Sequence, residues 1–233
     1  MAEPERPVTT VEETEPVEAV EPSGLLLHGV VSVRGHERAL AKMALKGEDE
    51  LVEHQGLAAL VHTVPYRLPD WETERIRAHS RTVERAMRRC TIVPAPYGIV
   101  FRGQQEIVEF LANQHIALTE ALSFLEGAFE MRLHIQTSGR RLDLSESRQA
   151  DRVAEFYKTL RRRSRAAFPL PVAAPKILSA AFLVDRAEWV SFVEHADELD
   201  HQYPEFQFDL TGPWPPYDFV KISFFPREIL DEE

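Results

Sequence analysis

Residues 211–220 read Thr-Gly-Pro-Trp-Pro-Pro-Tyr-Asp-Phe-Val, and they directly follow an alternating apolar run over residues 206–210. This alternation has the period of two that is typical of a half-buried strand. A strand is therefore expected to lead into the segment. Three prolines fix their own φ angles, and each residue that precedes a proline is pushed toward extended backbone. Residues 211–220 are predicted to form a stiff, non-helical segment, which we call the strap.

The strap carries the candidate site of the chain. A rigid backbone loses little further entropy on ordering, so its aromatic side chains can act as anchors. They can clamp the strap onto the protein's own core or face a partner; we favour the clamp, for which Trp214→Ala should cost roughly 3–5 kcal/mol. A partner-facing Trp214 would leave stability within about 0.5 kcal/mol. The candidate structural or partner-binding residues are Gly212, Pro213, Trp214, Pro215, Pro216, Tyr217 and Phe219.

The composition describes an acidic, cysteine-poor chain of 233 residues with a net charge of −11 and 44% hydrophobic residues. This length allows one large domain or two smaller ones. The negative balance repels phosphate backbones, so no nucleic-acid partner is expected. Cys90 stands alone, which excludes an internal disulfide and a Cys-rich metal site and fits a reducing compartment. No long apolar run or secretory signal is present, so no membrane partner is expected and the predicted location is cytoplasmic.

The order of predicted elements indicates an α+β fold with two domains. Strands and helices occur in both halves, without a repeat of fixed period. The leading residues are rich in Glu and Pro and lack periodicity, so they are not expected to bury a core. The predicted parts are a disordered acidic leader at 1–23, a ferredoxin-like domain at 24–103, a long connecting helix at 104–127, and a smaller-sheet α+β domain at 128–233 that ends in the strap.

The N-terminal domain is predicted around one buried strand. Residues 25–33 form a nearly continuous apolar run, which indicates a central strand covered on both faces. Gln55 and Gly56 are the expected turn of a hairpin between strands at 50–54 and 57–64. The remaining predicted elements are helices at 36–46 and 71–89 and a short strand at 99–101. Together they give the order β-α-β-β-α-β of a ferredoxin-like unit.

The C-terminal domain opens with the cleanest strand pattern of the chain, at 129–136. Apolar residues alternate there with Glu130, Arg132, His134 and Gln136, so one face of the strand is expected to be exposed to water. The other predicted elements are a helix from 143 to about 167, a strand at 176–184, a helix from 185 to about 199, and the strand at 206–210.

Residues that often carry chemistry are scattered in this sequence. His79 and His115 interrupt apolar helical stripes, but no His-Glu-x-x-His motif accompanies them, and locally hydrogen-bonded histidines are the simpler interpretation. Cys90 follows two arginines that would lower a thiol pKa, yet it continues an apolar stripe. Arginine-rich stretches at 75–89 and 161–165 indicate solvated faces, or else docking to an acidic partner surface. No catalytic, metal-binding or cofactor-binding residue is predicted.

The strap resembles the C-terminal signature of the gas vesicle accessory proteins of the F/L type. Three further segments resemble family signatures in the expected order, and the resemblance covers the chain from about Gly24 to Val220. Two differences stand out: the opening strand commonly carries Tyr where His28 stands, and the central motif usually has Arg, an aromatic, Gly and Thr at 96–99. The three segments are Leu-His-Gly-Val-Val at 27–31, Gly-Leu-Ala-Ala-Leu-Val at 56–61 and Val-Pro-Ala-Pro-Tyr-Gly-Ile-Val-Phe at 93–101.

This resemblance implies a role in building the gas vesicle, a gas-filled compartment walled by a small, hydrophobic shell protein. The implied function is that of a non-catalytic accessory protein, without cofactors, that binds shell protein during nucleation or growth of the vesicle. Other accessory proteins are a second class of implied partner, and the implied location is the cytoplasm, in association with the vesicle. The main alternative is a small-molecule-binding or enzymatic ferredoxin-like protein, because such units often hold ligands between sheet and helices.

Overall fold

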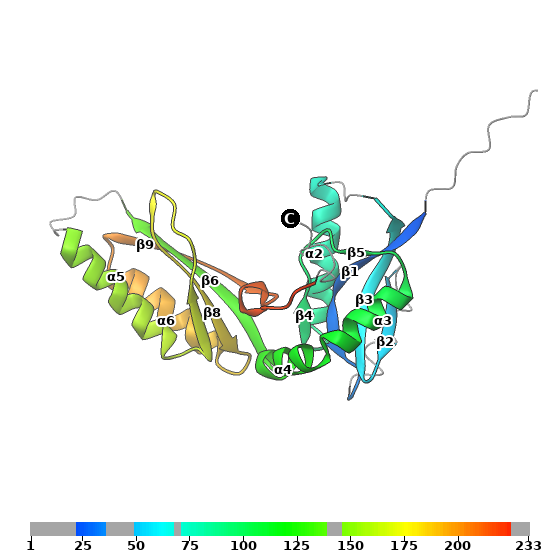
Figure 1. Cartoon of the computed structure of the whole chain (residues 1–233). Coiled ribbons are helices and arrows are strands. Elements are labelled where there is room, and N and C mark those ends of the chain that lie inside the picture. Colours follow the sequence, from blue (N-terminus) through cyan, green and yellow to red (C-terminus); the bar gives the residue numbers. More distant parts are fainter. Residues whose placement is uncertain (1–21, 36–48, 68–70, 139–145, 225–233) are drawn as a thin grey trace, which may run out of the picture.

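The computed structural model describes residues 22–35, 49–67, 71–138 and 146–224, which form two antiparallel sheets and five α-helices. The α+β class predicted from the sequence is confirmed. The two halves of the chain lie on either side of a V, with α4 at its base (Figure 1). The predicted leader at 1–23, apart from residues 22 and 23, and the predicted helix at 36–46 lie outside the described residues. No helix within the described ranges is long and apolar enough to cross a membrane.

The first sheet has the strand order β2-β3-β1-β4, and β5 pairs with the other end of β1. Its strands are β1 (Ser23–Ser32), β2 (Asp49–His54), β3 (Leu57–Pro65), β4 (Ile92–Pro94) and β5 (Val100–Phe101). Every pair is antiparallel. The predicted hairpin is confirmed, because Gln55 and Gly56 both have positive φ, at 48° and 84°, as its tight turn requires.

Helices cover both faces of this sheet, which explains why β1 is buried along nearly its whole length. Helix α2 (Thr73–Met87) packs on one face through Val83, Ala86 and Met87. Helices α3 (Gln104–Asn113) and α4 (His115–Leu125) pack on the other face. The continuous apolar run at 25–33 therefore indicated a strand with two covered faces, as expected.

The ferredoxin-like assignment of this half stays a prediction. Its strand order and its antiparallel directions are those of a β-α-β-β-α-β unit. However, the helix that would join β1 to β2 falls within residues 36–48, outside the described part of the chain. The sequence pattern missed β4, since Pro94 obscured it, and the strand expected at 99–101 is the short β5.

The prediction of one long helix at 104–127 is wrong, because the chain breaks there into α3 and α4. Gln114 stands between them with φ −102° and ψ 9°, outside the regular helical range. The break lets both apolar stripes face the same core: Ile107 and Leu111 from α3, and Leu118 and Leu122 from α4.

The second sheet has the strand order β7-β8-β6-β9, and it is covered on one face by two helices. Its strands are β6 (Ala128–Thr137), β7 (Ala166–Pro169), β8 (Lys176–Asp185) and β9 (Phe206–Trp214), and its helices are α5 (Glu146–Arg161) and α6 (Trp189–Gln202). Phe156, Phe182 and Phe192 fill the layer between sheet and helices. The predicted helix to about 167 ends earlier, at Arg161, because its last residues form the edge strand β7.

Candidate functional site: the strap

The first part of the strap is a strand rather than an irregular segment, because β9 continues to Trp214. It pairs with β6 through a register shift between Glu130 and Arg132. A proline is tolerated in a strand at a sheet edge or at a bulge, where its missing N–H does not remove a hydrogen bond between strands. Pro213 meets both conditions, because β9 is an edge strand and Pro213 lies at the register shift. Gly212 has φ 132° and lies against β6, so that an added Cβ would stand 2.9 Å from the Glu130 carbonyl oxygen.

The second part of the strap covers a buried carboxylate. Glu130 is fully buried, which corrects the expectation that it faces water. The backbone N–H of Asp218 donates to Glu130 Oε2 at 2.9 Å, within the short 3₁₀ turn η1 (Tyr217–Phe219). Arg132 Nε donates to Glu130 Oε1 at 2.6 Å and to Asp218 Oδ2 at 3.0 Å. The strap therefore contains a short 3₁₀ turn, which corrects the prediction of a non-helical segment. Glu130, Arg132 and Asp218 connect this turn to β6.

The surroundings of the Glu130 carboxyl group favour its protonated form below about pH 7. Burial raises the pKa of Glu130 to about 7, and the Asp218 N–H and the Arg132 guanidinium oppose that rise. Two carboxyl groups share one guanidinium here, so the second negative charge of Asp218 raises the Glu130 pKa further. Burial also raises the pKa of the Tyr217 phenol, with Glu84 of α2 adding to the effect.

From the turn onward, the chain packs on the N-terminal half of the molecule. Tyr217 contacts the cluster around α2, and Phe219 packs against the core formed by β1, α3 and α4. Phe224 is buried in that same core and stacks on Phe110 of α3 with a centroid distance of 5.9 Å. Figure 1 shows this last segment, in orange to red, running from the second sheet to the first half. The strap thus joins the two halves.

Two arginines from the second half add to this connection. Arg186, after β8, donates from Nη2 to the Met87 carbonyl oxygen of α2 at 2.8 Å, and its guanidinium lies 4.5 Å from the ring centroid of Phe129. Arg165 donates from Nη1 to the carbonyl oxygens of Phe124 and Glu126, at 2.6 and 2.8 Å. These carbonyls belong to the end of α4, where no further helical N–H can reach them.

Trp214 differs from the other strap aromatics because 39% of it is exposed. Its indole N–H donates to Thr211 Oγ1 at 3.1 Å, within the same strand. Pro215 and Pro216 are buried instead, and Tyr217 is half-buried. The buried part of the strap thus lies within residues 215–219, whereas the Trp214 ring is partly exposed.

We therefore expect Trp214→Ala to lower the free energy of unfolding by about 1 kcal/mol, as for a partly exposed side chain. The larger cost expected for a buried ring does not apply at this position. Urea unfolding of the wild type and the variant measures the difference. A loss of roughly 3 kcal/mol or more would mean that the ring clamps the strap after all.

A histidine pair lies inside the first half, between β1 and α2. His28 and His79 are both buried, and their Nδ1 atoms are 2.9 Å apart. The Ala95 carbonyl oxygen accepts from His79 Nε2 at 3.0 Å, so His79 accepts at Nδ1 and His28 is the donor. Burial lowers the pKa of His28 to about 3 and also lowers that of His79. Asp49 stands 3.6 Å from His28 Nε2, but its carboxylate is already paired with Arg85 at 3.0 Å.

The structure also shows the surroundings of Cys90 and His115, the other residues considered for catalysis or metal binding. Burial raises the pKa of the Cys90 thiol to about 11, which disfavours the thiolate that a nucleophile needs. His115 is half-buried at the start of α4, with Nε2 at 3.3 Å from the Gln55 carbonyl oxygen. Among the described residues no group of three His, Cys, Asp or Glu side chains could hold a metal ion.

Sequence reasoning did not find one Ser-His contact on the open face of the second sheet. His134 Nδ1 lies 2.9 Å from Ser179 Oγ, and Asp209 stands opposite His134 on β9. Ser179 is 2% exposed, so a substrate could not reach its hydroxyl, and the contact is a cross-strand hydrogen bond. Predicting this contact would have required the register between β6 and β8, which the sequence alone does not give.

Fold and strap together define a two-sheet α+β protein whose C-terminal segment fastens one half to the other. The chain belongs to the gas vesicle synthesis protein GvpL/GvpF family, whose model matches residues 24–144 and 134–221. The match includes both sheets and the strap. This confirms the resemblance seen in the sequence and makes the chain a member of a family of gas vesicle accessory proteins.

Individual relatives agree with this assignment. The chain is 24% identical over 205 residues to gas vesicle protein F1 of Halobacterium salinarum, with 85% of this chain and 93% of the relative covered. It is 27% identical over 223 residues to gas vesicle protein L of a Streptomyces species, with 74% and 83% covered. The crystal structure of GvpF from Anabaena sp. matches with a TM-score of 0.74 at 19% identity, over 86% of this chain and 97% of that one. This likeness shows a shared fold.

Proposed function

We propose that this protein is a gas vesicle assembly accessory protein that binds the hydrophobic shell protein while the vesicle nucleates or grows. The observation that carries the proposal is the family match across both halves of the chain. Free shell subunits would expose large apolar surfaces, and a folded partner could mask these surfaces until the subunits polymerise. The protein acts in the cytoplasm and at the vesicle by binding and without catalysis, and other accessory proteins are further partners.

Within this proposal, the strap holds the two halves in the arrangement that binds shell protein. Its contacts support that role, since the Glu130–Asp218 hydrogen bond anchors it to one half and Phe219 packs into the other, where Phe224, just beyond the strap, is also buried. We also propose that residues 24–103 form a ferredoxin-like unit, which the β2-β3-β1-β4 strand order supports.

Co-expression with the shell protein of the same vesicles tests the proposed function. We expect tagged protein to retain shell protein in the soluble fraction and to elute with it, because the complex covers apolar surface that would otherwise aggregate. A host whose copy of the gene is deleted should make few or no vesicles. The proposal is wrong if shell protein neither elutes with the tagged protein nor gains solubility, and if vesicles form normally after deletion.

A further inference from the structure

An apolar groove runs between helix α5 and the β7–β8 edge, on the side of the second half that lies away from the strap. Its volume is about 430 Å³. The groove is open because β7 pairs only with residues 180–183 of β8, so β8 extends beyond its neighbour. Two small side chains, Ala150 and Ala154, stand one helical turn apart on the facing wall. Its apolar lining includes Ala150, Val153, Ala154, Tyr157, Ile177 and Leu178.

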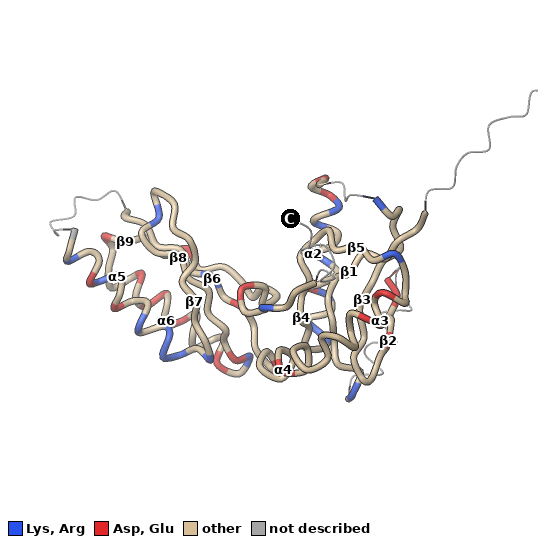
Figure 2. The backbone as a smooth tube through the Cα atoms, viewed as in Figure 1, with Lys and Arg blue, Asp and Glu red and all other residues tan. Residues whose placement is uncertain are grey.

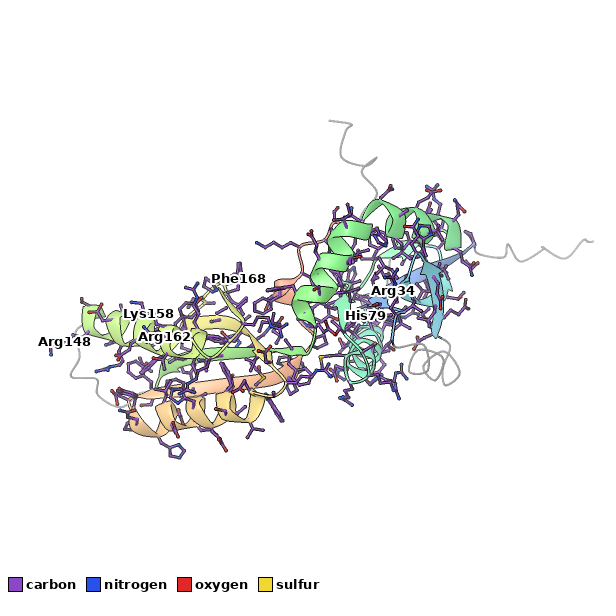
Figure 3. The ribbon with its side chains drawn as sticks, turned by 90° about the horizontal axis from the view of Figure 1, so that it is seen from below. Arg34, His79, Arg148, Lys158, Arg162 and Phe168 are labelled. Carbon is purple, nitrogen blue, oxygen red and sulfur yellow. The ribbon has the colours of Figure 1, made fainter. Side chains whose placement is uncertain are left out.

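One end of the groove is cationic. Lys158 follows Ala154 by one turn of α5, and Arg161 follows Tyr157 by one turn, so both cations continue the wall of the groove. Arg162 comes next, and all three side chains are exposed, without an ion pair to the described part of the chain. Figure 2 shows blue segments at this end of α5, and Figure 3 labels Lys158 and Arg162 there.

We infer that this groove is the docking surface for an amphipathic helix of the shell protein that carries carboxylates beside its apolar stripe. This inference rests on the proposed function. The wall from Ala150 to Tyr157 is about 10 Å long at 1.5 Å per residue, which matches two turns of a helix lying alongside α5. Such a helix buries side chains spaced i, i+3/i+4 and i+7. A docked strand fits less well, because Pro169 removes a hydrogen-bond donor from the edge of β7.

Charge complementarity selects the acidic partner. The chain as a whole has a net charge of −11 and repels anionic segments. The exposed cations at the end of α5 are a local exception, positioned beside the apolar surface. Two carboxylates, Asp151 and Glu155, lie on the same helix, and Glu155 is paired with Arg152 at 2.8 Å. An acidic helix is therefore steered to the cationic end, and its apolar stripe fills the groove.

Binding of a shell subunit fused to a soluble carrier protein, measured by biolayer interferometry, tests this inference. Ala154→Trp fills the groove from an exposed position. The double variant Lys158→Glu, Arg161→Glu reverses the sign of the charge at the cationic end of the groove. Each is expected to weaken binding about tenfold or more, as for a change at the centre of an interface. The control Arg148→Glu reverses a charge on α5 outside the groove lining, at the helix end labelled in Figure 3, and should bind within about twofold of wild type.

Melting curves show whether the variants remain folded, which is expected because all four positions are exposed. If the wild type does not bind the shell fusion, the proposed function is wrong and this inference fails with it. If the wild type binds and both groove variants bind within about twofold of it, the groove is not the docking surface although the proposed function stands. A loss with Ala154→Trp but not with the double charge variant would overturn the acidic character of the partner helix.

Discussion

Gly212→Val is expected to lower the free energy of unfolding by about 4 kcal/mol, because strained backbone and overpacking each cost roughly 1–3 kcal/mol. The backbone at Gly212 has φ 132°, which side-chain-bearing residues rarely adopt. A Cβ placed there would stand 2.7 Å from Met131 Sδ and 2.9 Å from the Glu130 carbonyl oxygen. Met131 is 2% exposed and belongs to the core of the second half, so it has little room to move.

Urea unfolding of Gly212→Val and wild type measures this effect. Gly103→Ala is the matched control, because the backbone at Gly103 is extended, with φ 176°, and nothing lies within 4 Å of an added Cβ. Because Gly103 is the N-cap residue of α3, where Ala is less favourable than Gly, the control should cost no more than about 1 kcal/mol. An unfolding midpoint of Gly212→Val equal to that of the control would show that the strap tolerates a side chain at the bulge, and that its close packing on β6 does not matter for stability.

Glu130→Ala is expected to lower the free energy of unfolding by about 3 kcal/mol, because it removes a buried carboxyl group that accepts two hydrogen bonds. The Asp218 N–H would lose its acceptor, and the Arg132 Nε–H would keep only Asp218 Oδ2. The turn of the strap would lose its fastening to β6. Glu155→Ala is the control: this exposed carboxylate pairs with Arg152 on α5, and surface pairs contribute about 0–1 kcal/mol.

The pH dependence of Glu130→Gln tests the same contact with an uncharged side chain that keeps one of the two acceptor oxygens. The folded-state pKa of about 7 lies above the ordinary value of 4.5, so burial favours the protonated form. The stability that this form contributes is fully present below pH 4.5 and is lost as the pH rises through 7. The wild type should therefore lose stability relative to Glu130→Gln over that interval, at up to about 1.4 kcal/mol per pH unit. Parallel stability curves for the two proteins would mean that Glu130 is ionised throughout.

Local patterns were enough to predict most elements of the fold. The alternation at 129–136 predicted β6, the apolar run at 25–33 predicted a strand with two covered faces, and Gln55 with Gly56 predicted the hairpin turn. Each of these signals depends on residues that are close in sequence. The strap was likewise found from its own prolines and aromatics, and its resemblance to the family agrees with the family match.

Errors arose where a distant segment changed the surroundings of a residue. Glu130 has the sequence position of a water-exposed strand residue, yet a turn 88 residues later covers it. The stripes of Ile107 and Leu118 fit one helix by spacing, but the chain breaks at Gln114 and both stripes pack into one core. Trp214 has the composition of a core anchor, although the pairing of β9 leaves it partly exposed.

The sequence by itself determined the kinds of elements, the α+β class and the family, because side-chain periodicity and short motifs are local properties of the chain. Tertiary structure decided which elements meet. It placed His79 against His28, 51 residues earlier, and it directed the strap from the second sheet into the core of the first half. It also left the groove beside α5 open. The physical reason is that burial and hydrogen bonding between distant segments depend on how whole sheets and helices pack, and not on the spacing of residues within one element.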